Sequence, residues 1–581
     1  MRVDSRVRRK TKRGLAKVIV SAISLWKKLD MSNPLNANEW GEWTDEDAVF
    51  TNVTYAGHKV EDGSVRVFGV FGKPNHGDKF PTVLLLPDGG KRYDTQLMRF
   101  FIDKGYAVLM PDYSGKMTSD TEDTPHTVYP QSLDFARYEI ASGLDELRGI
   151  EIEKSCWFEW LYVANYSIEY LKSRADVGNI GVVGIRLGGE IAWKAMLSPD
   201  IKCGIPINAV GWRSYRGVNK FVANAESNMS DEKHLYMAGI DSQSYAPFVK
   251  CPTMTLCALR DECYDPDRAY DTFCRIGTSE GSAIAYSLDG GSCIGSKTLG
   301  NIDLFLGKHL KGREIYIPSA LNITAKDEDG EIEVCVESDP GAILAELNIF
   351  YAEAELGTKA VFRNWHRICH ADGKEGKDGK FIFRIQPNST DANAFIYASA
   401  KYFNDFRIAS KIISKKVPGD NKTPKNKLLY GGKRLDSFCV ADNKGYSIGE
   451  IFLEREAFPK KEIGYGGIEG AYSVGGIKTY KISSPTYLPD EGSLLKFDVY
   501  TAEGVTLIVT VDVATSGNFE KYKCRIPVKA GGKWKRIVLN AIDFKNDVEG
   551  KNLKSFIYGK ALSFESEREE NKFAITNIIW L

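Results

Sequence analysis

One turn in the sequence has the spacing of a catalytic motif but an unsuitable residue at its centre. Residues 179–185 form a short buried run, Gly184 and Gly188 enclose the next three residues, and a helical pattern begins at once. Strand, strained turn and helix in this order hold the central serine of a G-x-S-x-G motif above the edge of a sheet, where it acts as a nucleophile. Here the central residue is Arg186. A guanidinium group stays protonated and has no nucleophilic atom, so it cannot attack a carbonyl group.

The sequence around this turn predicts a doubly wound, mostly parallel sheet. Residues 49–71 alternate between polar and apolar side chains, as half-buried antiparallel strands do. The buried runs Pro81–Leu86 and Tyr106–Met110 are joined by a helical pattern, and strand, helix and strand at this spacing form a parallel pair. Later buried runs and a closing helix lie at 204–210, 253–259, 283–287 and 304–310. We expect one α/β domain over residues 45–312.

Several segments of this domain resemble a known family. They are Leu84–Gly90, Tyr106–Gly115, Asn179–Gly189, the pair Arg260-Asp261 and Phe305–Leu310. Together they look like the dienelactone-hydrolase and acetylxylan-esterase branch of the α/β-hydrolases. The resemblance implies the α/β-hydrolase fold. An active enzyme of this fold also needs a nucleophile on the turn, an acid after a late strand and a histidine before the last helix.

The resemblance assigns one residue to each of these three positions. Arg186 takes the position of the nucleophile, Asp261 that of the acid and Ser292 that of the histidine. None of the 7 histidines of the chain lies in the window 288–296. The oxyanion loop is expected at Asp88, Gly89, Gly90 and Leu187. We expect Arg186, Asp261 and Ser292 to lie together below this loop, because the fold brings these segments to one edge of the sheet.

The loss of nucleophile and base together predicts a catalytically impaired protein. A triad acts as a unit, and loss of the nucleophile alone costs on the order of 10⁶-fold in rate. The chain would then serve as a scaffold or bind a carbohydrate or an acylated small molecule, without a cofactor. One alternative is an active carbohydrate esterase with a displaced nucleophile, for which Cys293, Ser292 and Ser114 are candidates. Another is a structural protein whose β domains assemble into a homo-oligomer.

Arg186 itself has two interpretations. Its guanidinium group could face the Asp88-Gly89-Gly90 loop and bind a carboxylate, a phosphate or a sugar hydroxyl. It could instead form an ion pair with Asp88 or Asp261 and plug the site.

Beyond Gly312 the pattern contains strands only. Residues 313–417 predict an immunoglobulin-like β-sandwich, and a linker rich in turn residues follows at 418–430. Residues 431–581 are again rich in strands, and their last part is similar to galactose-binding-like jelly rolls that occur as carbohydrate-binding modules. The fold class is therefore a multi-domain chain, an α/β-hydrolase domain followed by two all-β domains.

The resemblance to carbohydrate-binding modules implies sugar binding through exposed aromatic rings. The candidates in the Gly-rich stretch of the last domain are Tyr465, Tyr472 and Tyr480. The alternative is that these three residues are ordinary aromatics of turns and edge strands.

The composition is that of a folded protein without a strongly charged partner surface. Apolar residues make up 43% and charged residues 27% of the 581 residues, and 77 basic side chains balance 77 acidic ones. Nothing in this balance favours a nucleic acid partner. The 11 cysteines include no C-x-x-C pair, which argues against a zinc site and a disulfide framework. Reduced thiols are typical of a cytoplasmic protein.

Residues 1–44 are expected to form a basic extension ahead of the first domain. Basic side chains crowd its first 17 residues, and the apolar run Val18–Trp26 follows. This run is too short to span a bilayer, and no small-residue cleavage site follows it. Residues 1–30 are either a basic helix on a membrane surface or a disordered extension, with Met31 as the true start in the second case. No other segment has the length of a transmembrane helix.

Overall fold

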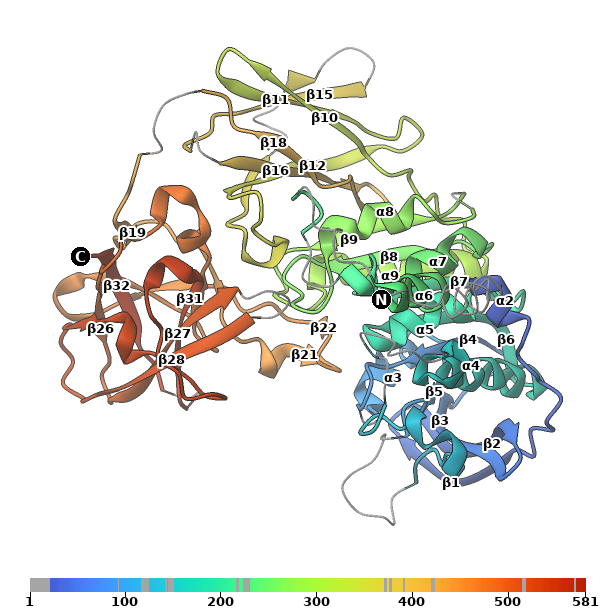
Figure 1. Cartoon of the computed structure of the whole chain (residues 1–581). Helices are drawn as coiled ribbons and strands as arrows, with labels where there is room; N and C mark the ends of the chain where they lie inside the picture. Colours follow the sequence, from blue (N-terminus) through green and yellow to red (C-terminus); the bar gives the residue numbers. More distant parts are fainter. Residues whose placement is uncertain are drawn as a thin grey trace, which may run out of the picture. The chain divides into compact units, whose positions relative to one another are not determined.

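The chain forms two compact units in a computed structural model (Figure 1). The first comprises residues 1–214, 228–251 and 275–278, and the second comprises 215–227, 252–274 and 279–581. The described residues are 21–91, 93–115, 125–141, 144, 151–215, 219–222, 230–278, 280–369, 374–375, 379–389, 392–419, 424–514, 519–568 and 571–581. The predicted α/β domain is divided between the two units, so each unit is described by itself.

The first unit contains a sheet in the order β1-β2-β3-β5-β4-β6-β7. Its strands are β1 (Asn38–Asp45), β2 (Ala48–Val60), β3 (Gly63–Pro74), β4 (Phe80–Leu86), β5 (Ala107–Pro111), β6 (Val177–Ile185) and β7 (Ile201–Ile207). The first strands pair antiparallel, up to the contact of β3 with β5. From β5 onward, through β4, β6 and β7, the pairing is parallel. The predicted antiparallel entry and the predicted parallel strand pair are both confirmed.

The described residues of this unit contain α-helices after β4, before and after β6, and outside the predicted helical patterns. They are α2 (Ala22–Trp26), α3 (Thr95–Ile102), α4 (Cys156–Ser173), α5 (Leu187–Ala195), α6 (Asp231–Gly239) and α7 (Ser242–Tyr245). Helix α3 begins after Asp94, whose carboxylate accepts hydrogen bonds from the N–H groups of Gln96 and Leu97. Helix α4 is buried over most of its length, because its aromatic residues lie on several faces.

Part of the predicted N-terminal extension belongs to the folded unit. Ser21 caps α2 in a capping box, and Ala22 and Leu25 of this helix are each only 1% exposed. The N–H group of Asp30 donates to the hydroxyl of Tyr162 at 2.9 Å. Ala22 and Leu25 of α2 therefore pack inside the protein, whereas Ile23 and Trp26 are partly exposed. A packed helix thus begins residues 21–30 in place of the expected disordered extension, whereas residues 1–20 lie outside the described part, and the expected membrane-surface helix stays a prediction.

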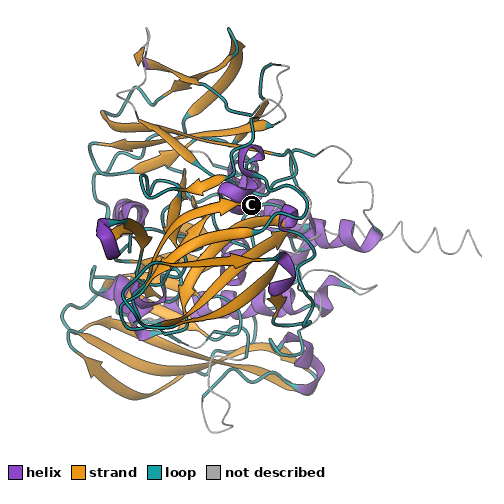
Figure 2. Ribbon diagram, turned by 90° about the vertical axis from the view of Figure 1, so that its left-hand side faces the viewer, coloured by secondary structure: helices purple, strands orange, loops and turns teal. Residues whose placement is uncertain are grey.

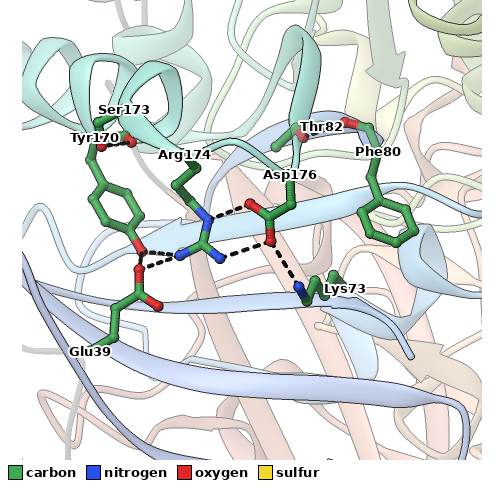
Figure 3. A network of polar contacts seen from close by, with 8 residues as sticks. All are labelled: Glu39, Lys73, Phe80, Thr82, Tyr170, Ser173, Arg174 and Asp176. Atoms are coloured by element: carbon green, nitrogen blue, oxygen red, sulfur yellow. Dashed lines mark hydrogen bonds and ion pairs between the residues drawn. The ribbon is translucent and has the colours of Figure 1, made fainter. Parts of the chain in front are cut away.

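A polar network ties the end of α4 to the sheet (Figure 3). Nε and Nη2 of Arg174 each donate to Asp176 at 2.9 Å, and Nζ of Lys73 on β3 donates to the same carboxylate at 2.8 Å. Arg174 also contacts Glu39 of β1 and lies 3.9 Å from the ring centroid of Phe71. Burial raises the pKa of Asp176, but hydrogen bonds from Arg174 and Lys73 outweigh it and lower the pKa to about 2.

Asp176→Asn is expected to destabilise the first unit by about 1 kcal/mol at pH 7, after allowance for solvent screening. An acid with a lowered pKa in the folded state stabilises it above the pKa of the unfolded chain, and this contribution is lost as the pH falls from about 4 to about 2. Urea unfolding at pH 7 measures the effect. The control Asp134→Asn removes an exposed ion pair with Arg137 and is expected to change little. Equal losses in both variants would contradict the prediction.

The second unit begins with the late elements of the predicted α/β domain. Strands β8 (Met254–Ala258) and β9 (Ala283–Ser287) pair in parallel and are buried along their whole length. Helix α8 (Ala269–Phe273) precedes β9, and α9 (Ser296–Lys311) follows it. Helix α9 ends at Gly312, which adopts the left-handed conformation at φ 69°.

The described residues beyond Lys311 contain strands and short 3₁₀ helices but no α-helix, so the prediction of an all-β C-terminal half is confirmed. Two sheets cover residues 322–416, in the orders β10-β11-β15-β14 and β13-β12-β16-β17, and β18 also pairs with β16. The strands are β10 (Asn322–Glu328), β11 (Glu331–Glu337), β12 (Leu344–Ala354), β13 (His366–Cys369), β14 (Lys374–Glu375), β15 (Lys380–Ile385), β16 (Asn393–Tyr402), β17 (Arg407–Ala409) and β18 (Ile413–Lys416).

Two further sheets and a separate pair of short strands make up the C-terminal part, and Figure 2 draws all strands in orange. Their orders are β23-β24-β32-β26-β29, with β19 beside β32, and β20-β25-β31-β27-β28-β30. The larger strands are β26 (Leu495–Tyr500), β27 (Val505–Ala514), β28 (Phe519–Val528), β29 (Lys535–Leu539), β31 (Gly559–Ser566) and β32 (Ala574–Trp580). The shorter ones are β19 (Leu428–Tyr430), β20 (Phe438–Val440), β23 (Lys460–Ile463), β24 (Glu469–Tyr472), β25 (Ile477–Thr479) and β30 (Lys545–Asn546). Strands β21 (Ser447–Ile448) and β22 (Phe452–Leu453) form a separate two-stranded sheet.

Both C-terminal sheets contribute to one hydrophobic core. Phe497 of β26 and Phe564 of β31 are fully buried, and their rings pack edge to face at a centroid distance of 5.0 Å. Strand β19 pairs with β32. The last three residues of the predicted linker 418–430 therefore belong to a sheet. Within the described residues, no helix has the length and apolar character needed to cross a bilayer.

Candidate active site

The turn between β6 and α5 has the strained geometry that the sequence predicts. Strand β6 ends at Ile185, α5 begins at Leu187, and Arg186 between them adopts φ 48° and ψ −110°. A β-carbon on Gly184 would overlap the carbonyl group of Gly188, and one on Gly188 would overlap that of Leu86. Only glycine allows these close approaches. The turn therefore holds its central residue in a conformation that non-glycine residues rarely adopt.

Arg186 forms an ion pair with the residue that begins the predicted oxyanion loop. Its Nη1 atom lies 3.6 Å from Oδ2 of Asp88, and the two side chains are 18% and 23% exposed. This is the ion pair that the plug interpretation of Arg186 requires.

The Asp88 carboxylate also occupies backbone donors of the predicted oxyanion loop. Its Oδ1 atom accepts the N–H group of Gly89 at 2.9 Å and the N–H group of Leu187 at 3.3 Å. The N–H group of Gly90 donates to Oγ of Ser114 at 3.3 Å. The N–H groups of Gly89, Gly90 and Leu187, three of the four residues predicted for the oxyanion loop, therefore each have a partner within the protein.

The ring of Tyr138 covers the two glycines of this loop. A β-carbon on Gly90 would lie 2.6 Å from the Tyr138 ring, and one on Gly89 would lie 3.0 Å from it. The sequence analysis did not single out Tyr138, because the ring reaches the loop from a distant segment. A substrate carbonyl group would have to displace this ring to reach the Gly89-Gly90 backbone.

Asp261 lies in the second unit, directly after β8. Its carboxylate is buried and accepts the N–H groups of Cys263 at 2.8 Å and Tyr264 at 3.1 Å. These bonds close a local turn. Because Arg186 belongs to the other unit, the predicted grouping of Arg186, Asp261 and Ser292 stays a prediction.

Ser292 lies half-buried in the loop between β9 and α9, which pairs with the β21–β22 segment. The N–H group of Ile294 donates to the carbonyl of Ile451 at 2.7 Å, and Ile294 accepts from the N–H group of Leu453 at 2.9 Å. The thiol of Cys293 donates to the carbonyl of Glu450 at 3.5 Å. The loop in which the fold would place a histidine is thus held on one side by a strand-like segment of the C-terminal part.

Two of the three tyrosines predicted to bind sugars are buried, so the prediction is wrong for these two. Tyr472 ends β24 and is 5% exposed, and Tyr480 follows β25 and is 6% exposed. Tyr480 stacks on the guanidinium group of Arg260 at 3.4 Å from the ring centroid. A ring must present an open face to stack on a sugar. The sequence pattern could not show which side of each strand faces the core.

Tyr465 is 58% exposed and lies beside a tryptophan that the sequence analysis missed. The indole N–H group of Trp534 donates to the carbonyl of Tyr465 at 3.1 Å. A β-carbon on Gly464 or on Gly470 would lie 2.7 Å from the indole ring, so both glycines leave room for it. The repeated glycines around Tyr465 were the available signal.

A buried charged cluster on α5 was also missed. Lys194 is 1% exposed, its Nζ atom donates to the carbonyl of Glu190 at 3.0 Å, and the Glu190 carboxylate accepts from Ser242. Asp241 is fully buried and accepts from the N–H group of Arg213 at 2.7 Å. The sequence signal for this cluster was a pair of charged residues one turn apart in an apolar helix, the helix that follows the strained turn.

Two further observations concern the side chains that could bind a metal and the cysteines. No three His, Cys, Asp or Glu side chains among the described residues gather as a metal site would need. All 11 cysteines are free thiols.

No family model matches the sequence, and no curated protein matches it. Similar solved structures include an acetyl xylan esterase from Paenibacillus sp. R4, at 16% identity and a TM-score of 0.34, over 46% of this chain and 85% of that one. Another is acetyl xylan esterase 1 from Thermoanaerobacterium sp. JW/SL YS485, at 12% identity and a TM-score of 0.33, over 46% and 84%. A CE15 glucuronoyl esterase from Teredinibacter turnerae T7901 matches at 12% identity and a TM-score of 0.30, over 44% and 70%. At such values the likeness carries no conclusion about activity.

Proposed function

We propose that this chain is an α/β-hydrolase-like protein without ester hydrolysis, whose first part serves as a scaffold for β domains that bind a ligand. The observation that supports this proposal is the Asp88 carboxylate, which accepts the N–H groups of Gly89 and Leu187 and pairs with Arg186. A negative charge therefore lies where an ester oxygen would have to become negative.

The chemistry of acyl transfer explains why this arrangement opposes catalysis. An oxyanion hole stabilises the negative oxygen of the tetrahedral intermediate through backbone donors that are free to receive it. Here the Asp88 carboxylate occupies those donors and forms an ion pair with Arg186. Arg186 also supplies no nucleophile.

Two of the three displaced nucleophiles of the alternative hypothesis, Ser114 and Cys293, are poorly placed for attack. Ser114 is 3% exposed and accepts the N–H group of Gly90. Cys293 is 8% exposed, and its thiol donates to the Glu450 carbonyl. A nucleophile needs both access to the substrate and an adjacent base.

An esterase assay on the purified full chain tests the proposal. Hydrolysis of p-nitrophenyl acetate is expected at the rate of buffer alone. A faster rate that is lost in Cys293→Ala, Ser292→Ala or Ser114→Ala would instead establish an active enzyme with a displaced nucleophile.

A second candidate function is carbohydrate binding at Tyr465 and Trp534 in the C-terminal part, which we propose to be a jelly roll. The support is the exposed ring of Tyr465 next to the half-buried indole of Trp534, whose ring lies 5.5 Å from that of Tyr500 between centroids. Nζ of Lys533 lies 5.7 Å from the Tyr465 ring and offers a donor for sugar hydroxyls. Aromatic faces beside polar donors suit a pyranose ring.

Tyr465→Ala is expected to weaken binding of a glycan selected on a glycan array by about fivefold, because a stacking ring contributes roughly 1 kcal/mol. Quenching of tryptophan fluorescence measures the affinity. The control Tyr558→Ala removes another exposed tyrosine of the same part, which is 53% exposed. The absence of any bound glycan, or equal weakening by both variants, would reject this function. A particle mass above that of one chain in light scattering would support self-assembly instead.

A further inference from the structure

The segment after β8 is bound to the β domains through a completely buried ion pair. Nη1 and Nη2 of Arg363 donate to the two carboxylate oxygens of Asp267 at 2.6 Å each. The side chains are 0% and 1% exposed. The guanidinium group also lies 3.5 Å from the ring centroid of Phe395 on β16, and its Nε donates to the carbonyl of Thr358 at 3.1 Å. Arg363 is thus satisfied on its edges and on one face.

Arg260 makes a second connection beside the first. Its Nη1 donates to the carbonyl of Val361 at 2.8 Å and to that of Arg363 at 3.2 Å. The same guanidinium group stacks on Tyr480. Residues 358–365 therefore lie between the loop that carries Asp261 and the C-terminal sheets.

The end of the α/β part makes further contacts to the same β domains. The side chain of Asn301 on α9 donates to the carbonyl of Arg407 at 2.7 Å and accepts from its N–H group at 2.9 Å. The ring of Tyr286 on β9 packs edge to face on that of Tyr397, at 5.4 Å between centroids. These contacts are buried and specific, unlike the polar interfaces that usually let domains of one chain move.

A buried pair of this kind responds asymmetrically to substitution. Removing one partner leaves an uncompensated charge in the interior, which is strongly destabilising, whereas replacing both by apolar side chains is often neutral. The pair therefore couples the folding of the elements on which its two residues lie.

We infer that β8, β9 and the β domains open and close as one cooperative unit, held by the Asp267–Arg363 pair. The boundary of cooperative unfolding then lies inside the predicted α/β domain and not at Gly312. The segment after β8, which would carry the catalytic acid in an esterase, here connects β8 and β9 to the β domains. This inference holds whether or not the chain hydrolyses esters.

Native-state hydrogen exchange on the full chain tests this inference. In the wild-type protein, the slowest amides of β8, β9 and β16 are expected to share one opening free energy and one denaturant dependence, distinct from those of β4 and β6. In Asp267→Asn, exchange in β8, β9 and β16 is expected to rise about 100-fold or more, with β4 and β6 unchanged.

Two further variants separate the ion pair from a general loss of stability. The double variant Asp267→Leu/Arg363→Met removes both charges and is expected to restore most of the protection. The matched control Arg384→Met removes an exposed pair with Glu331 and is expected to leave exchange within twofold of wild type.

Exchange of β8 and β9 together with β4 and β6 in the wild-type chain would overturn the inference. An effect of Asp267→Asn confined to residues 358–365 would do the same. If Asp267→Asn does not fold, the exchange pattern of the wild-type protein and that of the double variant still test the inference.

Discussion

Arg186→Ser combined with Ser292→His is expected to hydrolyse esters no faster than buffer alone. Adding Asp88→Ala to this double variant is expected to raise the rate to about 100-fold or more above that of buffer. The double variant supplies a nucleophile and a candidate base. However, the Asp88 carboxylate still accepts the N–H groups of Leu187 and Gly89. Without its Arg186 partner, this carboxylate would repel a developing oxyanion. Asp88→Ala frees both donors, and a single such donor is worth about 100-fold or more in rate.

The measurement is the initial rate of p-nitrophenyl acetate hydrolysis by wild type, double variant and triple variant. A matched triple variant with Asp78→Ala in place of Asp88→Ala removes an exposed carboxylate from the same unit. Its rate is expected to equal that of the double variant. A double variant as fast as the triple variant with Asp88→Ala would show that Asp88 does not block the oxyanion site. Wild-type turnover above buffer would contradict the proposed function itself.

Asp241→Asn is expected to remove most of the loss of stability that the wild-type first unit undergoes as the pH rises from about 4 to about 7. Burial raises the pKa of Asp241 to about 7, against a hydrogen bond from Ser214 and with the help of the Glu190 charge. An acid whose pKa is raised in the folded state stabilises it below the pKa of the unfolded chain. This contribution is lost as the pH rises through the folded-state value, at up to about 4 kcal/mol in total.

The neighbouring charged groups do not change the stability of the first unit in the same pH range. Burial lowers the pKa of Lys194 from 10.5 to about 8, so its contribution changes between those two values, where stability rises with pH. Arg213 stays charged throughout. The slope between pH 4 and 7 should therefore follow mainly Asp241, with a further part from Glu159, whose pKa burial also raises.

Urea midpoints of wild type, Asp241→Asn and the exposed control Asp78→Asn, measured at several pH values, test this expectation. The control is expected to keep the wild-type slope. Asp241→Asn also weakens hydrogen bonds to Arg213 and Ser214, which lowers stability at every pH but adds no slope. A wild-type slope in Asp241→Asn would show that another group titrates in this window.

The sequence alone predicted the features that depend on neighbouring residues. Gly184 and Gly188 are needed because backbone atoms approach them closely, and the spacing of these glycines predicted the strained turn at Arg186. Apolar runs of five to seven residues predicted the parallel strands, since a strand buried on both faces has no polar positions. The change to short alternating strands beyond Gly312 predicted the all-β part in the same way.

Only the tertiary structure decided what these elements contact. Asp88 and Leu187 are 99 positions apart, and Asp267 and Arg363 are 96 apart, so no local pattern could show that each pair shares a hydrogen bond. The same limit explains the errors at Tyr472 in a strand and at Tyr480 just after one, because an aromatic residue at such a position fits a core and a surface equally well in sequence. Burial depends on which face another sheet or loop covers. A sequence fixes local conformation through short-range sterics and periodicity, whereas the occupation of a site depends on side chains that folding brings together from distant positions.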